Sequence, residues 1–219
     1  MNGLSLGIAV GLGMLANLLT EYFLSDDLQQ PYFRLESAGQ RFRIVRWGIV
    51  LVGMLGLGLA QISLPGLLMM ALLTVTAATD LETKFLPPDR FVYGSTFLGV
   101  LSAWFTHGSL GLRDAVIAQG FCFAVVTLGV ALFNVCDSGD IKLAMQFGAA
   151  CGSLALIAQA AFWTWIAACL LFAFQLSRYR LQNSWRSAFK QAAQYRPPEG
   201  PLLWCGLMVA VALAQAGGR

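Results

Sequence analysis

The 219-residue chain carries little charge and a single histidine. It contains 14 Lys and Arg residues and 11 Asp and Glu residues, so that 11% of its positions are charged. A soluble domain of this length would carry about 25% charged residues. The composition is therefore unlike that of a soluble globular domain. The formal net charge of +3 is modest and gives no argument for nucleic-acid binding.

The chain also lacks the residue patterns of several common sites. It has no H-E-x-x-H motif and no glycine-rich loop ending in Gly-Lys, so neither a zinc protease nor a phosphate-binding loop is indicated. No pair of cysteines has the C-x-x-C spacing of a zinc or redox site. The cysteines are Cys122, Cys136, Cys151, Cys169 and Cys205. We expect no metal and no cofactor, and we interpret each cysteine as a small apolar residue.

Long apolar runs dominate what is present. The chain is 58% hydrophobic, with a mean hydropathy of +0.68. The runs are roughly 15 to 22 residues long, enough to cross or nearly cross a hydrocarbon layer of about 30 Å. We predict an all-α integral membrane protein, a polytopic bundle of about eight transmembrane helices with one short or re-entrant helix. The predicted spans are 4–24, 45–61, 65–79, 91–106, 115–135, 142–157, 159–176 and 201–217.

Basic residues predict which end of the bundle faces the cytoplasm. They gather in residues 25–46, 80–90 and 177–200 and at Lys142, whereas Arg113 lies in a short turn between two runs. Because Lys and Arg accumulate on the cytoplasmic side, we expect these segments to be cytoplasmic and both termini to lie outside. The segment 177–200 mixes aromatic and basic residues at near-helical spacing, and we expect it to lie along the inner leaflet. The first run has no basic residue before it, so we expect a retained helix.

Two aspartates end up at the same predicted membrane depth. Asp80 ends the third run and Asp140 lies between the fifth and the sixth, so both face the cytoplasm. Two carboxyl groups that share a site titrate as a pair, one ionised and the other protonated. Such a pair can activate water and protonate a leaving amine, which is the chemistry of an aspartyl protease.

The residues around these aspartates resemble a known family. Residues 79–89 read TDLETKFLPPD, residues 138–152 read SGDIKLAMQFGAACG, and residues 196–207 read RPPEGPLLWCGL. Together they are similar to the motifs of the type IV prepilin peptidases, which are G-x-G-D membrane aspartyl proteases. The resemblance covers about residues 65–217. It implies that residues 47–219 form a membrane-embedded peptidase core, whereas residues 1–46 hold the first helix and a short cytoplasmic loop.

The resemblance also implies a reaction. Asp80 and Asp140 would be the catalytic pair, at the cytoplasmic face of a bacterial inner membrane. The substrate would be a prepilin or pseudopilin precursor, cut after a glycine that separates a short basic leader from a hydrophobic helix. The partners are therefore the precursor and the lipid bilayer, with no nucleic acid.

Four residues near the pair are candidate supporting residues. Gly139 would let the backbone leave helical geometry beside the acid. Lys142 would stabilise the ionised pair or mark the headgroup level. Asp137 stands where the family has the first glycine of its motif, and it either tunes the pair or is solvated. Glu82 either binds the basic leader or is a loop charge.

One departure from the family predicts a missing activity. Long members carry a cysteine-rich segment after the first helix that is associated with N-methylation of the processed pilin. Residues 25–45 are too short for this segment and contain no cysteine. We expect cleavage without methylation. Two other functions stay open: a proton-coupled transporter, whose acids should lie near mid-bilayer, and a catalytically silent membrane scaffold.

Overall fold

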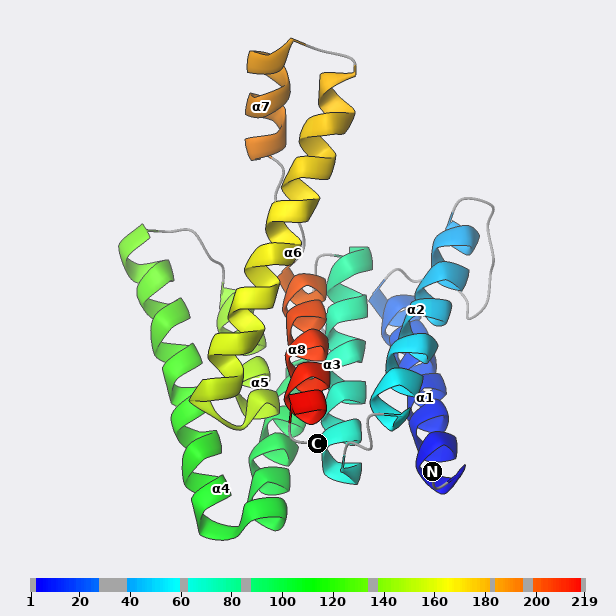
Figure 1. Ribbon diagram of the computed structural model, residues 1–219, viewed down its shortest axis with the longest axis vertical. Coiled ribbons are helices and arrows are strands. Elements are labelled where there is room, and N and C mark those ends of the chain that lie inside the picture. The colour runs from blue at the N-terminus through cyan, green and yellow to red at the C-terminus, as the bar shows by residue number, and fades with distance from the viewer. Residues whose placement is uncertain are drawn as a thin grey trace.

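The structure is a computed structural model that describes residues 3–27, 39–59, 63–83, 88–133, 138–181, 184–194 and 199–217 (Figure 1). Within these ranges the chain forms eight α-helices and no strand, so the predicted all-α class is confirmed. The helices are α1 (Gly3–Asp27), α2 (Gly39–Leu59), α3 (Leu64–Thr83), α4 (Asp89–Phe133), α5 (Ser138–Cys151), α6 (Leu154–Arg180), α7 (Trp185–Gln194) and α8 (Glu199–Gly217).

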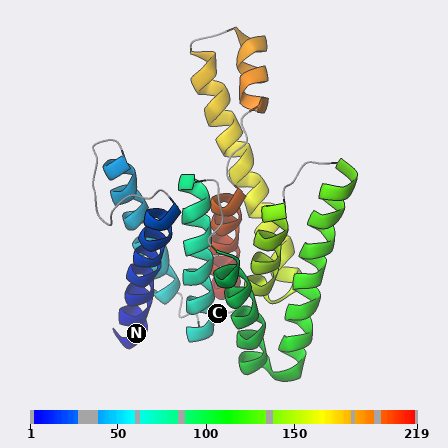
Figure 2. The same ribbon diagram turned by 180° about the vertical axis from the view of Figure 1, so that it is seen from behind.

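Helix α3 lies at the centre of the bundle. It packs against α1, α2, α4, α5 and α8, and these neighbours bury most of its side chains. The C-terminal end of α3 and the N-terminal ends of α5 and α8 lie at one end of the bundle, whereas the bend in α4 and the α5–α6 turn lie at the other (Figures 1 and 2). We call the first of these the Asp80 end.

Helix α4 consists of two arms joined at a glycine. Gly108 has φ 64° and ψ −148°, a conformation that glycine adopts without steric cost. Gly111 then lets the second arm start close to the first, because a Cβ atom there would lie 2.3 Å from the carbonyl oxygen of Ala103. The two arms correspond to the predicted runs 91–106 and 115–135, so the turn between them was correctly located.

Helix α5 is short and closely packed, as the sequence predicted. It has 14 residues, and a Cβ atom at Gly148 would lie 2.9 Å from the carbonyl oxygen of Ala118 on α4. Gly152, with φ 65°, then reverses the chain. Ser153 caps α6 by accepting a hydrogen bond from the backbone N–H of Leu156 at 3.3 Å. The turn therefore lies at 152–153, N-terminal to the boundary predicted near 157–159.

The outer surface of the bundle is strongly apolar. In the part of the chain that the structure describes, three helices are long and apolar enough to cross a membrane, over Ser5–Leu24, Asp89–Leu132 and Leu154–Arg180. Most side chains of the last two remain exposed; Phe105, for example, is 75% exposed. Soluble monomers rarely expose contiguous apolar patches larger than a few hundred Å². The exposed faces of α4 and α6 are thus suited to an apolar surrounding.

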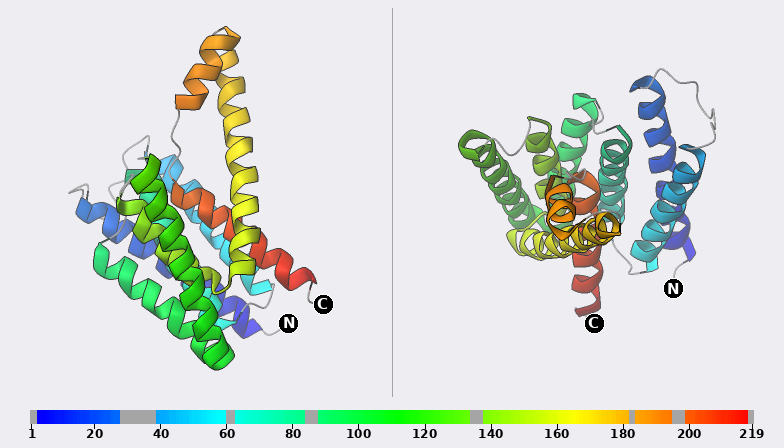
Figure 3. Two further views of the ribbon diagram at one scale, coloured as in Figure 1. Left: turned by 90° about the vertical axis from the view of Figure 1, so that its left-hand side faces the viewer. Right: turned by 90° about the horizontal axis from the view of Figure 1, so that it is seen from above.

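Helix α7 does not lie across the end of the bundle. Helix α6 extends beyond the other helices, and α7 folds back along it to form a projecting hairpin (Figures 1 and 3). Phe189 packs edge-on against Phe172 of α6, with ring centroids 5.7 Å apart, and the Arg180 guanidinium lies 5.0 Å from the ring centroid of Trp185. The helical spacing predicted within 177–200 is confirmed for α7, and these contacts hold the helix along α6. Its position along the inner leaflet stays a prediction.

A buried ion pair joins α1 to α2. Arg46 is 4% exposed and Glu21 is 5% exposed. Arg46 Nη2 donates to Glu21 Oε1, and Trp47 Nε1 donates to the same oxygen at 3.4 Å. The sequence analysis counted Arg46 only as one of the cytoplasmic basic residues. The structure shows that its guanidinium is instead withdrawn from the surface to neutralise an acid on α1.

Candidate active site

Asp80 is held by the start of the last helix. It lies near the C-terminal end of α3, where its side chain is partly buried. The backbone N–H of Gly200 donates to Asp80 Oδ2 at 2.8 Å. The first amides of a helix have no acceptor within that helix, and α8 begins at Glu199. Asp80 therefore supplies an acceptor to α8 from another helix, and the positive end of the α8 dipole favours its carboxylate form.

Only glycine fits comfortably at position 200. A Cβ atom there would lie 2.9 Å from Asp80 Oδ2 and 3.1 Å from the Cα atom of Ala77. The second distance is to backbone, which cannot rotate away. Gly200 follows Glu199 and precedes Pro201 in the third motif, PPEGP. Because it has no side chain, α8 can approach α3 closely enough for the Gly200 amide to reach Asp80.

We expect the substitution Gly200→Ala to destabilise the protein by about 1–3 kcal/mol, as overpacking commonly does. The extra methyl group must push α8 away from α3 or displace the Asp80 side chain. The measurement is the midpoint of thermal unfolding in detergent micelles. Gly56→Ala is the matched control, because nothing lies within 4 Å of a Cβ atom at that position of α2. Equal unfolding midpoints for the two variants would contradict the close approach.

Asp140 lies at the same end of the bundle as Asp80. It is in the first turn of α5 and is partly buried, as is Gly139. The structure thus brings the ends of the two helices that carry these acids to one end, around α3, which packs against both α5 and α8 (Figures 1 and 2). Gly139 is helical, because α5 already begins at Ser138. The prediction that it breaks helical geometry was wrong.

Lys142 has a definite partner. Its Nζ atom donates to Asp89 Oδ1 at 2.6 Å, which ties the start of α5 to the start of α4. Lys142 was expected to stabilise the catalytic pair or to mark the headgroup level, whereas its observed partner is Asp89. The spacing of the two residues, 53 positions, gave no signal for this contact.

Two candidate residues cannot be compared with the structure. Asp137 lies outside the described residues. Glu82 lies in the last turn of α3, but its side chain is outside the part of the structure that is described. Among the described residues, no group of three or more His, Cys, Asp or Glu side chains is placed to hold a metal ion.

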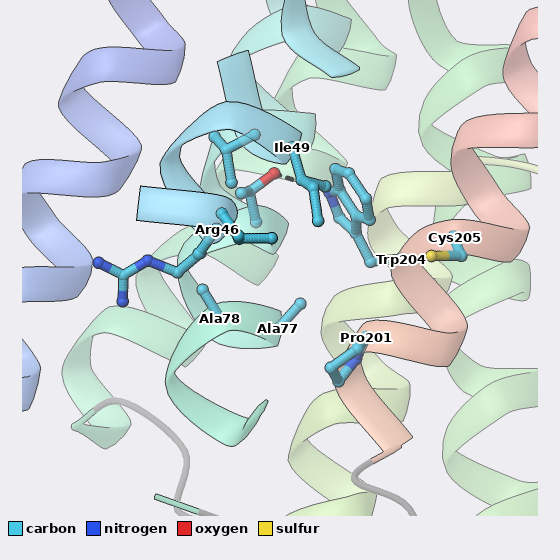
Figure 4. A pocket seen from close by; sticks show the side chains of 10 residues that line it. Arg46, Ile49, Ala77, Ala78, Pro201, Trp204 and Cys205 are labelled. Carbon is cyan, nitrogen blue, oxygen red and sulfur yellow. Dashed lines mark hydrogen bonds between the residues drawn. The ribbon is translucent and has the colours of Figure 1, made fainter. Parts of the chain in front are cut away.

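An apolar pocket lies near the end of α3 that carries Asp80, although Asp80 does not line it. It has a volume of about 170 Å³ and is formed by α2, α3 and α8 (Figure 4). Ala77 and Ala78 of α3 form one wall, within one helical turn of Asp80. Pro201, which follows the glycine that contacts the acid, forms another part. Ile49 of α2 faces the pocket from the opposite side.

The position of Trp204 in this pocket is fixed by a hydrogen bond. Its indole Nε1 donates to the hydroxyl of Thr74 at 2.7 Å, as Figure 4 shows. That hydroxyl in turn donates to the carbonyl oxygen of Met70 at 2.6 Å. The indole ring thus forms a rigid boundary between α8 and α2. Cys205 also lines the pocket.

A second hollow adjoins the pocket on the side of the bundle. It has a volume of about 510 Å³ and shares Val45, Ile49 and Trp204 with the first. It continues along α2 past Gly53, where α2 and α8 are in contact, because a Cβ atom at Gly53 would lie 3.2 Å from the Trp204 ring. The pocket near Asp80 is therefore reached from the side of the bundle, between α2 and α8.

Another hollow lies at the opposite end of the bundle. It has a volume of about 580 Å³ and is lined by the turn of α4, including His107 and Asp114, and by the α5–α6 turn. His107 thus lies at the opposite end of the bundle from the ends of α3 and α5 that carry the two motif aspartates (Figure 1). A comparison of the chain with protein-family models, curated proteins and solved structures gives no match. A function for this protein is therefore inferred from the geometry of the candidate site.

Proposed function

We propose that this protein is a membrane aspartyl endopeptidase that removes the short basic leader of prepilin-like precursors. The observation that carries the proposal is the environment of Asp80. The acid of the first motif accepts the Gly200 amide of the third motif. The acid of the second motif begins α5 at the same end of the bundle. The three motifs that resemble those of one family thus each contribute a residue to the Asp80 end of the bundle.

The proposal includes a membrane location with eight passes. They are α1, α2, α3, the two arms of α4, α5, α6 and α8. The exposed apolar faces of α4 and α6 support it, because such surfaces are stable in lipid and costly in water. Among the described side chains, Lys142, Arg178, Arg180, Arg186 and Lys190 lie toward the Asp80 end and Arg113 lies at the other. By the positive-inside rule, this distribution favours a cytoplasmic Asp80 end.

The mechanism requires one ionised and one protonated carboxyl group. The ionised group takes a proton from water, and the water oxygen bonds to the scissile carbonyl carbon. The protonated group donates its proton to the carbonyl oxygen. When the tetrahedral intermediate collapses, the C–N bond breaks and the leaving amine takes up a proton, so two carboxyl groups and one water complete the reaction. Asp80, with the Gly200 amide on Oδ2, would be suited to remain ionised.

The transporter alternative receives less support. Glu21 is a buried acid within the bundle, as a proton relay would require. It is engaged by Arg46 and Trp47, however, and this ion pair joins α1 to α2 as a structural contact. The motif aspartates both lie at one end of the bundle, where a relay across the bilayer would need groups along its length.

The test is cleavage by the purified protein in liposomes. The substrate is a precursor with a basic leader, a glycine and an apolar helix, and the products are identified by mass spectrometry. We expect a new N-terminus directly after the glycine, and we expect it to stay unmethylated when a methyl donor is added. A precursor that stays intact would contradict the proposed function, and a methylated product would contradict the prediction drawn from the short 25–45 segment.

A further inference from the structure

We propose that Asp89 and Gln146 are positioning residues, which hold Asp140 in place by fixing α5 along the first arm of α4. This inference rests on the proposed function, because it assigns a role in catalysis to two residues outside the catalytic pair. Asp80 lies on α3 and Asp140 on α5, but α5 packs mainly against α4. The contacts between α4 and α5 therefore help to determine where Asp140 stands relative to Asp80.

Two polar contacts follow one another along α5 and the first arm of α4. Lys142 Nζ donates to Asp89 Oδ1 at 2.6 Å, and Gln146 Nε2 donates to Ser95 Oγ at 2.7 Å. Positions 142 and 146 are four residues apart, so they lie on one face of α5. The higher-numbered residue on α5 meets the higher-numbered residue on α4, so the two helices run side by side in the same direction (Figure 1).

Small residues bring α5 close to both arms of α4. A Cβ atom at Gly99, on the first arm, would lie 3.1 Å from the Cβ atom of Ala149. A Cβ atom at Gly148 would lie 2.9 Å from the carbonyl oxygen of Ala118, on the second arm. Apolar packing of this kind is not directional, whereas a hydrogen bond requires a defined distance and angle. The polar contacts therefore determine how far along α4 the helix α5 sits.

The contact between Gln146 and Ser95 is buried. Gln146 is 0% exposed and Ser95 is 2% exposed. The Ser95 hydroxyl donates to the carbonyl oxygen of Val92 at 2.8 Å, which directs a lone pair to the Gln146 amide. If α5 shifted along α4, this amide group would lose its acceptor in a place that water does not reach, which is costly. The bond thus opposes a change of register.

The contact between Lys142 and Asp89 acts closer to the acid. The two side chains are 28% and 60% exposed, so the ion pair adds little to stability. It joins the first turn of α5, which carries Asp140, to the first turn of α4, which begins at Asp89. Its effect is therefore on position, and a displacement of a reacting group by about 1 Å can lower a rate by about 10²-fold.

The first experiment replaces Gln146 by leucine and measures kcat and KM for cleavage of the precursor. The carbonyl oxygen Oε1 of Gln146 is buried and accepts no hydrogen bond from the described residues, so leucine removes this unsatisfied group together with the contact to Ser95. We expect an unfolding midpoint close to that of the wild type, a similar KM, and a kcat lowered by about 10- to 100-fold. Gln175→Leu is the matched control, because Gln175 is 7% exposed on α6 and its Oε1 likewise has no partner among the described residues. A wild-type kcat in Gln146→Leu would overturn the role of Gln146, as would a higher KM at unchanged kcat.

The second experiment exchanges the charges of the ion pair. Asp89→Lys and Lys142→Asp should each lower kcat, whereas the double variant Asp89→Lys/Lys142→Asp should recover most of it, because opposite charges again join the two helices. The exchange Arg113→Asp/Asp114→Arg is the control, since these residues pair at 3.0 Å at the opposite end of the bundle. If the double variant is as slow as the single variants, Lys142 acts on the catalytic acids directly and the role of Asp89 is wrong.

The third experiment is independent of cleavage. Hydrogen exchange of the backbone amides in residues 138–147 is measured by mass spectrometry for the same variants, since exchange reports local opening of a helix. We expect faster exchange in Gln146→Leu and in each single charge variant, and recovery in the charge-exchanged double variant. Unchanged exchange in all of them would overturn the positioning role. If the wild type cleaves no precursor while exchange follows the expected pattern, the proposed function fails and the two contacts still fix the start of α5.

Discussion

Replacing Asp80 by asparagine is expected to abolish cleavage while leaving the bundle intact. Asparagine has nearly the same shape, and its side-chain oxygen can still accept the Gly200 amide, so the contact between α3 and α8 survives. The amide group cannot take a proton from water, however, and the loss of a positioned acid or base costs about 10²- to 10⁴-fold in rate. Asp140→Asn should have the same effect, because the proposed mechanism requires both acids.

The measurement is the ratio of mature to precursor pilin on co-expression, with the membrane level of each variant checked by immunoblotting. Asp114→Asn is the matched control: the acid lies at the opposite end of the bundle, its side chain is 46% exposed, and its loss should leave processing unchanged. If Asp140→Asn still processes the precursor while Asp137→Asn does not, the second catalytic acid has been assigned incorrectly although the function stands.

The second large effect is expected at the buried ion pair. Arg46→Met removes a buried cation from the carboxylate of Glu21, which is 5% exposed. Breaking a buried pair in this way costs about 3–5 kcal/mol, because the buried charge loses this counter-ion and is not returned to water. We expect a large fall in the thermal unfolding midpoint of the purified protein in micelles, and a smaller amount of protein in the membrane.

The double variant Glu21→Met/Arg46→Met tests whether the two side chains stabilise the protein through each other or through separate contacts. Apolar replacement of both partners is often neutral or stabilising, so the double variant should unfold at a higher temperature than Arg46→Met alone. If the double variant is as unstable as the sum of the two single variants, each side chain stabilises the protein through separate contacts and the pairing argument is wrong.

The helices could be predicted because their signals are local. Apolar runs, the glycine at 108 and the pair of small residues at 148 and 152 specify where the chain crosses the bundle and where it turns. The prediction failed for Gly139, where a family motif was read as a helix break. The packing of α7 along α6 was not predicted, because its aromatic contacts depend on how far α6 extends, which composition does not reveal.

The surroundings of the candidate site were only partly predictable. Motif resemblance identified Asp80 and Asp140, and the structure places the helix ends that carry them at one end of the bundle. The contacts of Asp80 with Gly200 and of Lys142 with Asp89 join positions that are 120 and 53 residues apart, and no periodicity links such positions. The sequence likewise gave no signal for the pairing of Glu21 with Arg46, because the positive-inside rule uses the number of Lys and Arg residues in each loop and does not identify their partners.

The hydrogen bond between Gly200 and Asp80 has a consequence for the order of biosynthesis. The ribosome releases α3 long before α8, since 120 positions separate donor and acceptor. A nascent chain that ends before residue 200 therefore holds Asp80 without this amide. On the proposed function, the enzyme would complete its catalytic centre only after the last helix has been translated and inserted, so an unfinished polypeptide in the translocon would not cut neighbouring proteins.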